Sequence, residues 1–160
     1  MLDEILAKVS DAETAALLSS YRLVILLLSP KQIEVIPSFL YEQNIPSINI
    51  SLVMANSLAV LSAKRRENEL FTLLKKRTLM NTSQSLWLNR LHILFEPSLN
   101  QEPIKLLKLL SKQTFMVVVW PGDYDDKALT YSLPGKPDYK YYPLSELKDV
   151  QVVYACDRSL

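Results

Sequence analysis

The sequence predicts a three-layer α/β domain in which helices flank a mostly parallel sheet. Apolar runs of strand length occur at 23–28, 86–88 and 115–120, and two further segments read as strands, 47–51, with Ile48 and Ile50 on one side, and 150–154. Segments with apolar residues at helical spacing lie between most of these runs, and such alternation is typical of parallel βαβ units. The run at 23–28, LVILLL, is apolar at every position, which indicates a central strand covered on both faces.

Capping residues and breakers predict where the helices begin and end. The apolar spacing indicates one amphipathic helix over 2–20, with a break in its middle left open as an alternative. Ser29 and Pro30 fit a second helix start, as N-cap and first helical residue, and Pro37 should kink or end that helix. The region 52–80 fits either two helices or one bent helix.

The stretch 86–120 is the central unit of the predicted sheet. Two apolar strands there enclose a turn bracketed by prolines and a helix, and strand, crossover and strand in this order form a parallel pair. Further along, 128–133 should be extended, 134–142 irregular and 143–148 one helical turn. No repeat or long linker divides the chain, so residues 1–160 are expected to form a single domain.

Composition excludes several classes of protein. Eighteen basic and seventeen acidic side chains give a net charge of +1, so no global field draws the chain to nucleic acid or to an anionic membrane. The longest apolar run is too short to span a bilayer, and the N-terminus is acidic where a signal peptide is basic. One cysteine and one histidine exclude a disulfide within the chain and cysteine- or histidine-rich metal centres. We therefore expect a cytoplasmic protein without a metal.

The junction between the first strand and the second helix is where nucleotide-binding α/β folds place phosphate groups. Here it reads LLLSPKQIEV, and the only two glycines of the chain, Gly122 and Gly135, lie far away. A phosphate-binding loop needs glycines for its backbone and a lysine for the phosphates. Ser29, Pro30 and Lys31 occupy the expected position, but only Lys31 has a suitable side chain, and a solvated first-turn lysine explains it as well.

A magnesium site would need an acidic residue at the end of a buried strand. The strand at 86–88 ends in Asn89, whose neutral amide lacks the charge that holds magnesium. Both halves of a nucleotide-hydrolysis site are therefore missing, and we expect no catalytic residues and no cofactor. ATP with magnesium stays open only as an alternative ligand, with Ser29, Pro30, Lys31 and Asn89 as its degenerate site.

Other catalytic groups are isolated in the sequence. His92 lies in an apolar segment, LHILF, where a packed or partly exposed histidine is the simpler explanation. Cys156 lies close to the end of the chain, and Asp123, Asp125 and Asp126 suit a solvated loop. None of these residues predicts an enzyme.

Two basic clusters and a tyrosine-rich segment allow a nucleic-acid hypothesis. The clusters are 64–66 and 75–77, and they share a face only if one helix passes through both. The tyrosines at 131–142 lie close to Lys136 and Lys140, a mixture that can stack bases or bind a partner protein. A solvated helix face and a lid over one end of the sheet are the alternatives.

Three segments carry a resemblance to a known family: ILFEPSLNQEPIKLLKLLS at 93–111, then VVVWPG, then LTYSLPGKPDYKYY at 129–142. They resemble the BrxF family, small P-loop-type proteins of BREX bacteriophage-defence systems, whose pattern reads LFDPSL-x-QDP-x-x-LL, a strand ending in W-x-G, and LTY-x-x-PG-x-P-x-Y. About the last 75 residues match well. The matching positions that we take as motif or interaction candidates are Phe95, Glu96, Pro97, Gln101, Glu102, Pro103, Trp120, Tyr131, Gly135 and Tyr139.

The resemblance implies a P-loop NTPase or AAA-like core within a multiprotein complex that blocks phage DNA replication. Three hypotheses follow. The first is a non-hydrolysing interaction or assembly module that binds other BREX proteins. The second is an ATP-binding regulatory subunit that self-associates or pairs with an active partner. The third is a DNA-binding accessory factor, with DNA contacted directly or through the complex. None of them involves a membrane.

Overall fold

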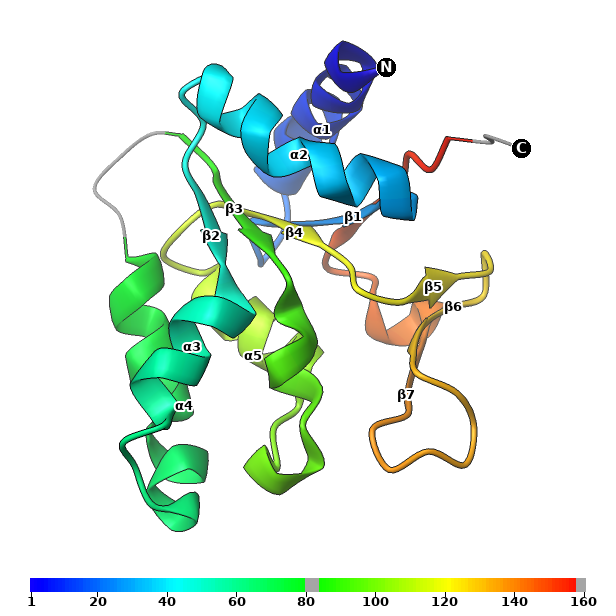
Figure 1. Cartoon of the computed structure of the whole chain (residues 1–160). Coiled ribbons are helices and arrows are strands. Elements are labelled where there is room, and N and C mark those ends of the chain that lie inside the picture. Colours follow the sequence, from blue (N-terminus) through cyan, green and yellow to red (C-terminus); the bar gives the residue numbers. More distant parts are fainter. Residues whose placement is uncertain (80–83, 158–160) are drawn as a thin grey trace.

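The computed structural model describes residues 1–79 and 84–157. Its main sheet has five parallel strands in the order β2-β3-β4-β1-β8 (Figure 1). These strands are β1 (Leu23–Leu27), β2 (Ser47–Asn49), β3 (Leu86–Asn89), β4 (Met116–Val119) and β8 (Gln151–Tyr154). The prediction of an α/β domain with a mostly parallel, helix-flanked sheet is therefore confirmed.

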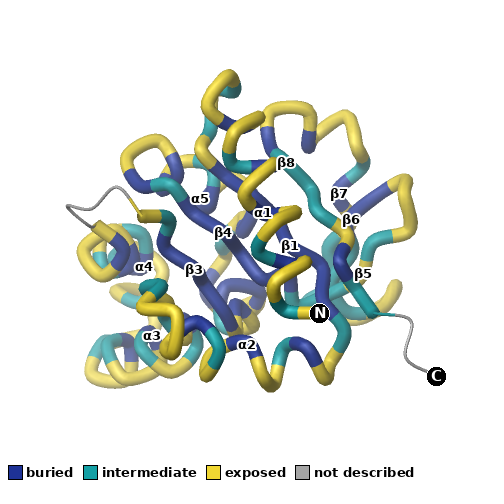
Figure 2. Tube along the Cα trace, turned by 90° about the horizontal axis from the view of Figure 1, so that it is seen from above, coloured by how far each residue is buried: buried dark blue, intermediate teal, exposed yellow. Residues whose placement is uncertain are grey.

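Helices cover both faces of this sheet (Figure 1). One face carries α1 (Leu2–Ala16) and α2 (Pro30–Glu42). The other carries α3 (Ile50–Leu58), α4 (Ala63–Thr78), α5 (Pro103–Leu110) and the 3₁₀ turns η1 (Leu91–Phe95) and η2 (Pro97–Leu99). In Figure 2 the tubes of β1, β3 and β4 are dark blue along their length, because both faces of each strand are covered.

The alternation of side chains along β1 divides the core into two clusters. Leu23, Ile25 and Leu27 pack on the face of α3, α4 and α5, whereas Val24 and Leu26 pack beneath α1 and α2. All five are at most 2% exposed. A strand buried on both faces needs apolar residues at every position, and the uninterrupted run LVILL meets that demand.

A second, smaller sheet lies beyond the carboxyl end of β4. It is antiparallel and consists of β5 (Asp123–Tyr124), β6 (Ala128–Tyr131) and β7 (Lys140–Pro143), followed by the turn η3 (Leu144–Glu146). The prediction of an extended segment at 128–133 is confirmed for β6, up to Tyr131, but Ser132 has a positive φ of 63°. The prediction of a helical turn at 143–148 is confirmed by η3. The prediction that 134–142 is irregular throughout was wrong, because β7 pairs with β6 and starts at Lys140.

The helix predictions need two corrections. The first helix ends at Ala16 rather than near residue 20, and it runs without a break. The second continues past Pro37 to Glu42, so the proline does not end it. Pro37 lies on the exposed side of α2, where water can replace a missing backbone hydrogen bond. Of the alternatives for 52–80, two helices are present, α3 and α4.

No helix within 1–79 or 84–157 combines the length and the apolar character needed to cross a bilayer.

Candidate functional site

The carboxyl ends of β1, β3 and β4 meet at one edge of the main sheet. The chain leaves β1 towards α2 on one face, and it leaves β3 towards η1 on the other. β4 lies between these two strands, and open α/β sheets bind their ligands outside the carboxyl ends of their strands. This edge is therefore the first place to look for a site, and Ser29, Pro30, Lys31 and Asn89 all lie at it.

At the start of α2, the backbone N–H groups of Ser29 and Gln32 are already hydrogen-bonded within the helix cap. The Ser29 hydroxyl accepts from the backbone N–H of Gln32 at 3.3 Å, and the Gln32 side chain accepts from the backbone N–H of Ser29 at 2.7 Å. This reciprocal capping box satisfies two donors that a phosphate-binding helix start would aim at its ligand. Pro30 has no N–H to offer. Lys31 is exposed.

Gln32 also fastens α2 to the end of β8. It is 1% exposed, and its Nε2 donates to the carbonyl oxygen of Ala155 at 2.9 Å. Its Oε1 also accepts from the backbone N–H of Asp157 at 3.3 Å. A side chain with this many partners is held rigidly. Gln32 was not among the predicted site residues, although the spacing S-x-x-Q at a helix start is a capping-box signal.

Asn89 ends β3 in the interior. Leu88 pairs in register with Val118, so Asn89 and Val119 follow side by side on the face of α2. Asn89 is 5% exposed, and its Oδ1 has no hydrogen-bond partner among the residues that the structure describes. A neutral amide beneath a helix does not provide the carboxylate that magnesium needs. Together with the closed start of α2, this means that the residues present do not fit a magnesium–nucleotide group.

A small cavity of about 170 Å³ remains at this edge. Its walls come from α2, from the residues after β3 and from the end of β4, and they are Pro30, Ile33, Glu34, Arg90, His92, Val119, Trp120 and Pro121. Arg90 is in the left-handed backbone region, with φ 54° and ψ 59°, at the sharp turn from β3 into η1. Burial and the charge of Arg90 lower the pKa of His92 below its usual value, so its imidazole is neutral at pH 7.

The aromatic residues of the family-like segments form one cluster. The rings of Phe95 and Tyr131 stack at 3.8 Å with an interplanar angle of 21°. Trp120 meets Phe95 edge to face at 5.5 Å and Tyr142 at 6.0 Å. The indole Nε1 of Trp120 donates to the carbonyl oxygen of Thr130 at 2.9 Å. These contacts attach the small sheet to the end of the main sheet.

The two glycines of these segments have backbone roles. A Cβ at Gly122 would overlap the carbonyl oxygen of Thr130, so only glycine permits this approach of β5 to β6. Gly135 has a φ of +90°, in the turn that links β6 to β7, and no atom lies close to the position of a Cβ there. In the same turn, the backbone N–H of Tyr139 donates to the carbonyl oxygen of Lys136 at 3.1 Å.

Side-chain contacts hold the turn FEPSLNQEP to α4 and to β7. Gln101 donates to the carbonyl oxygens of Leu99 at 2.7 Å and of Glu67 at 3.1 Å, which ties the turn to α4. Glu102 accepts from the hydroxyl of Tyr142 and lies 3.8 Å from the ammonium of Lys140, which ties it to β7. Burial and the bond to Glu102 raise the pKa of Tyr142, so this phenol stays protonated.

The remaining residues of this turn mark the starts of its short helices. Pro97 is the first residue of η2 and is preceded by the exposed Glu96. Pro103 is the first residue of α5 and is buried.

The structure therefore brings the predicted site residues together in two groups, and Pro30 of the first and Trp120 of the second line the same small cavity. Ser29, Pro30, Lys31 and Asn89 share the carboxyl edge of the main sheet, whereas the family-like residues hold the small sheet and the turn before α5. No three histidine, cysteine or carboxylate side chains gather as a metal site in the described part of the chain.

No family model, no curated protein and no solved structure matches this chain.

Proposed function

We propose that this protein is a non-hydrolysing subunit of a bacterial BREX anti-phage defence system, a P-loop-type α/β module that acts in the cytoplasm by binding other proteins of the complex. The observation that carries the non-hydrolysing part is the closure of the α2 start by Ser29 and Gln32. An N-terminus that serves its own capping box, and that is fastened to β8 through Gln32, has no open nest for phosphate.

The strand order and the resemblance support the family part of the proposal. A parallel sheet with β1 between β4 and β8, and a helix directly after β1, is compatible with a P-loop-type core. The family-like residues lie in the contacts that attach the small sheet, so the resemblance concerns an arrangement of the fold. That arrangement is separate from the positions where ATPase chemistry would take place.

Exposed apolar side chains on and beside the small sheet support a role in binding proteins. Leu133 is 65% exposed, Tyr141 51% and Leu144 44%. Aromatic residues are enriched at protein interfaces relative to the rest of a protein surface. Partner proteins that bind to this sheet would not contact the closed carboxyl edge, and this mode of binding requires no catalysis there.

The first experiment tests ATP binding and turnover. Titration calorimetry with ATP and magnesium should show no heat of binding, and purified protein should not release phosphate. Micromolar binding would instead support the alternative of an ATP-binding regulatory subunit. ATP hydrolysis that Lys31→Ala abolishes would contradict the proposal.

The second experiment tests association. A tagged copy expressed from its native operon should co-purify with other defence proteins, and Tyr141→Ala with Leu144→Ala should reduce that recovery. Tyr41→Ala with Leu52→Ala, which removes an exposed tyrosine and an exposed leucine from α2 and α3, is the matched control. Recovery of the tagged protein only as a self-associated species would contradict the association part.

The DNA hypothesis does not gain support from the residues first assigned to it. Arg65 pairs with Glu69 at 3.0 Å, and the Nε of Arg66 donates to the carbonyl oxygens of Leu58 at 2.9 Å and Leu61 at 3.0 Å. The basic clusters lie at opposite ends of α4, and Figures 1 and 2 show α4 and the small sheet on opposite sides of the molecule. These three features do not form one surface.

A further inference from the structure

The charges of this chain are unevenly distributed. From 70 to 95 there are four basic residues and no acidic one, and from 103 to 122 there are three basic residues and no acidic one. The first segment contains the end of α4, and the second contains α5. A near-neutral total therefore conceals two segments of purely positive charge.

The fold brings lysines from these segments to the amino ends of the parallel strands, opposite the carboxyl edge. The Nζ atoms of Lys108 and Lys112 lie 5.4 Å and 5.7 Å from the ring centre of Tyr21, the residue shortly before β1. Lys112 and Lys75 line a common depression between α5 and α4. Lys112 thus connects Lys75, which precedes β3, with Lys108 and Tyr21, which precede β4 and β1.

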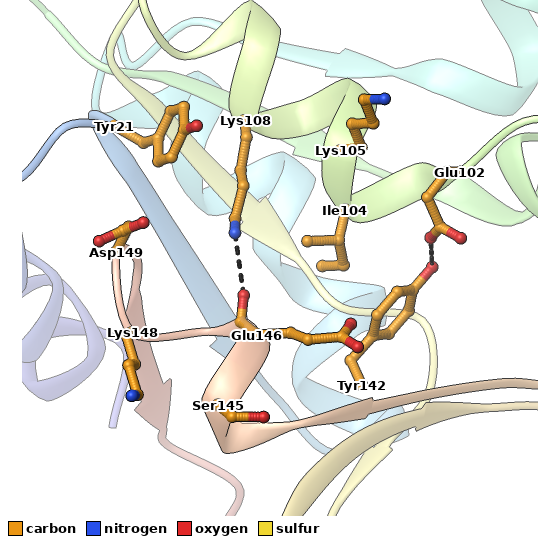
Figure 3. Close-up of a pocket in the computed structure, with 10 residues that line it drawn as sticks. All are labelled: Tyr21, Glu102, Ile104, Lys105, Lys108, Tyr142, Ser145, Glu146, Lys148 and Asp149. Atoms are coloured by element: carbon orange, nitrogen blue, oxygen red, sulfur yellow. Dashed lines mark hydrogen bonds between the residues drawn. The ribbon is translucent and has the colours of Figure 1, made fainter.

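A larger cavity of about 500 Å³ extends this surface towards the segment before β8 (Figure 3). Lys105, Lys108, Lys148 and Tyr21 are among the residues that line it. In Figure 3, Lys108 points from α5 across the cavity, and its Nζ donates to the carbonyl oxygen of Glu146 at 2.9 Å. We name Tyr21 and the five lysines at 75, 105, 108, 112 and 148 the amino-edge basic surface.

Few carboxylates neutralise this surface. Three line the cavity, and Glu102 already accepts from Tyr142 and lies near Lys140. The other two are Glu146 and Asp149. In the part of the chain that the structure describes, ion pairs within 4 Å are those of Arg65 with Glu69 and of Lys140 with Glu102. The cavity itself is balanced, because the lysines at 105, 108 and 148 line it together with these three carboxylates. The depression with Lys75 and Lys112 has no carboxylate in its lining, so the excess of positive charge lies there. None of the five lysines has an ion-pair partner among the described residues.

We propose that the amino-edge basic surface binds the phosphate backbone of nucleic acid, without sequence preference. Lysine ammonium groups are compact point charges that suit phosphate neutralisation, and aromatic rings among them are typical of nucleic-acid grooves. A membrane fits less well, because α5 buries five apolar residues and has only Leu109 as an exposed apolar residue. This inference does not depend on the proposed function.

The test is fluorescence anisotropy with a labelled DNA duplex and a labelled single strand, in salt from 25 to 200 mM. The wild-type affinity should fall steeply with salt, because each neutralised phosphate contributes a slope of about −0.9 on duplex and about −0.7 on a single strand. Lys105→Gln with Lys108→Gln and Lys112→Gln should weaken binding at least about tenfold. The duplex slope should also become shallower, by roughly one unit for each phosphate that the variant no longer neutralises.

The matched control is Lys8→Gln with Lys64→Gln and Lys136→Gln, which removes the same charge from exposed positions on other elements. It should bind within about twofold of the wild type. Equal losses in both triple variants would show an effect of net charge alone and would overturn the proposal, as would no binding at the lowest salt.

Two competitors separate the chemical classes of partner. Poly-glutamate and phosphatidylserine vesicles should displace DNA only weakly, and stronger displacement by either would assign the surface to an acidic protein or to a membrane. Circular dichroism of both triple variants checks folding. Co-purification with defence proteins should be unchanged in the α5 variant, so a failure of this proposal is distinguishable from a failure of the proposed function.

Discussion

The carboxyl edge of the main sheet and the small sheet differ in what their residues do. At the carboxyl edge, where open α/β sheets bind ligands, Ser29 and Gln32 hydrogen-bond to each other, and Gln32 also donates to the carbonyl oxygen of Ala155. In the small sheet, the residues that make the chain recognisable pack on one another and on the main sheet. The difference teaches that the side chains around the small sheet hold an arrangement of elements, whereas the position expected for chemistry is closed by its own capping residues.

The largest expected effect is on the aromatic cluster. Phe95→Ala removes the ring that stacks on Tyr131 and meets Trp120, and it leaves a cavity at the junction of the two sheets. We expect a loss of about 3–5 kcal/mol in the free energy of unfolding, measured by urea titration. Phe95→Leu should lose less than half as much free energy of unfolding as Phe95→Ala. A loss below about 1 kcal/mol for the alanine variant would mean that the cluster does not hold the small sheet.

The two glycines provide a matched pair for the second prediction. Gly122→Ala places a methyl group against the carbonyl oxygen of Thr130, so strands β5 and β6 must move apart. We expect about 2–4 kcal/mol of destabilisation in the same urea titration. Gly135→Ala meets open space and carries only the strain of its positive φ, about 1 kcal/mol. The reverse order of the two effects would contradict the role given to Gly122.

Gln32 and Lys31 test the carboxyl edge itself. Gln32→Ala leaves the Ala155 carbonyl and the N–H groups of Ser29 and Asp157 without their partner, which should cost about 1–3 kcal/mol. Lys31→Ala, at the neighbouring exposed position, should change stability by less than about 0.5 kcal/mol. If ATP with magnesium raised the melting temperature of the wild type but not of Lys31→Ala, the site would be open and the comparison would fail.

The smallest expected effect is a pH dependence from His92. Its pKa in the folded protein is lowered from about 6.5, first by burial and second by Arg90. The folded state therefore binds fewer protons than the unfolded state just below pH 6.5, and stability falls as the pH drops through that range. Urea titrations at pH 5 and pH 7.5 should show a smaller difference for His92→Gln than for the wild type. An unchanged difference would remove His92 as a contributor.

The sequence predicted the parallel sheet because its central strands β1, β3 and β4 are buried on both faces and are therefore apolar along most of their length. The apolar run at 23–28 predicted a buried central strand, which is β1. Ser29 and Pro30 predicted the start of α2 correctly. The sequence did not predict β7, because its residues, KYYP, show no clear alternation of apolar and polar side chains and several prolines lie within or close to it. Pairing with β6 determines that strand, and pairing between distant segments is not visible in local pattern.

The sequence by itself determined that no glycine-rich loop and no strand-end acid were available for nucleotide hydrolysis, because those losses are visible residue by residue. Only the tertiary structure decided which contacts are made at the start of α2 and which basic side chains come together at the amino ends of the strands. The partners of Gln32 lie 123 and 125 residues away, at Ala155 and Asp157, and the residues of the amino-edge basic surface come from segments before four different strands. Contacts over such separations depend on how the sheet orders its strands, and that order results from the packing of the whole chain rather than from any one segment.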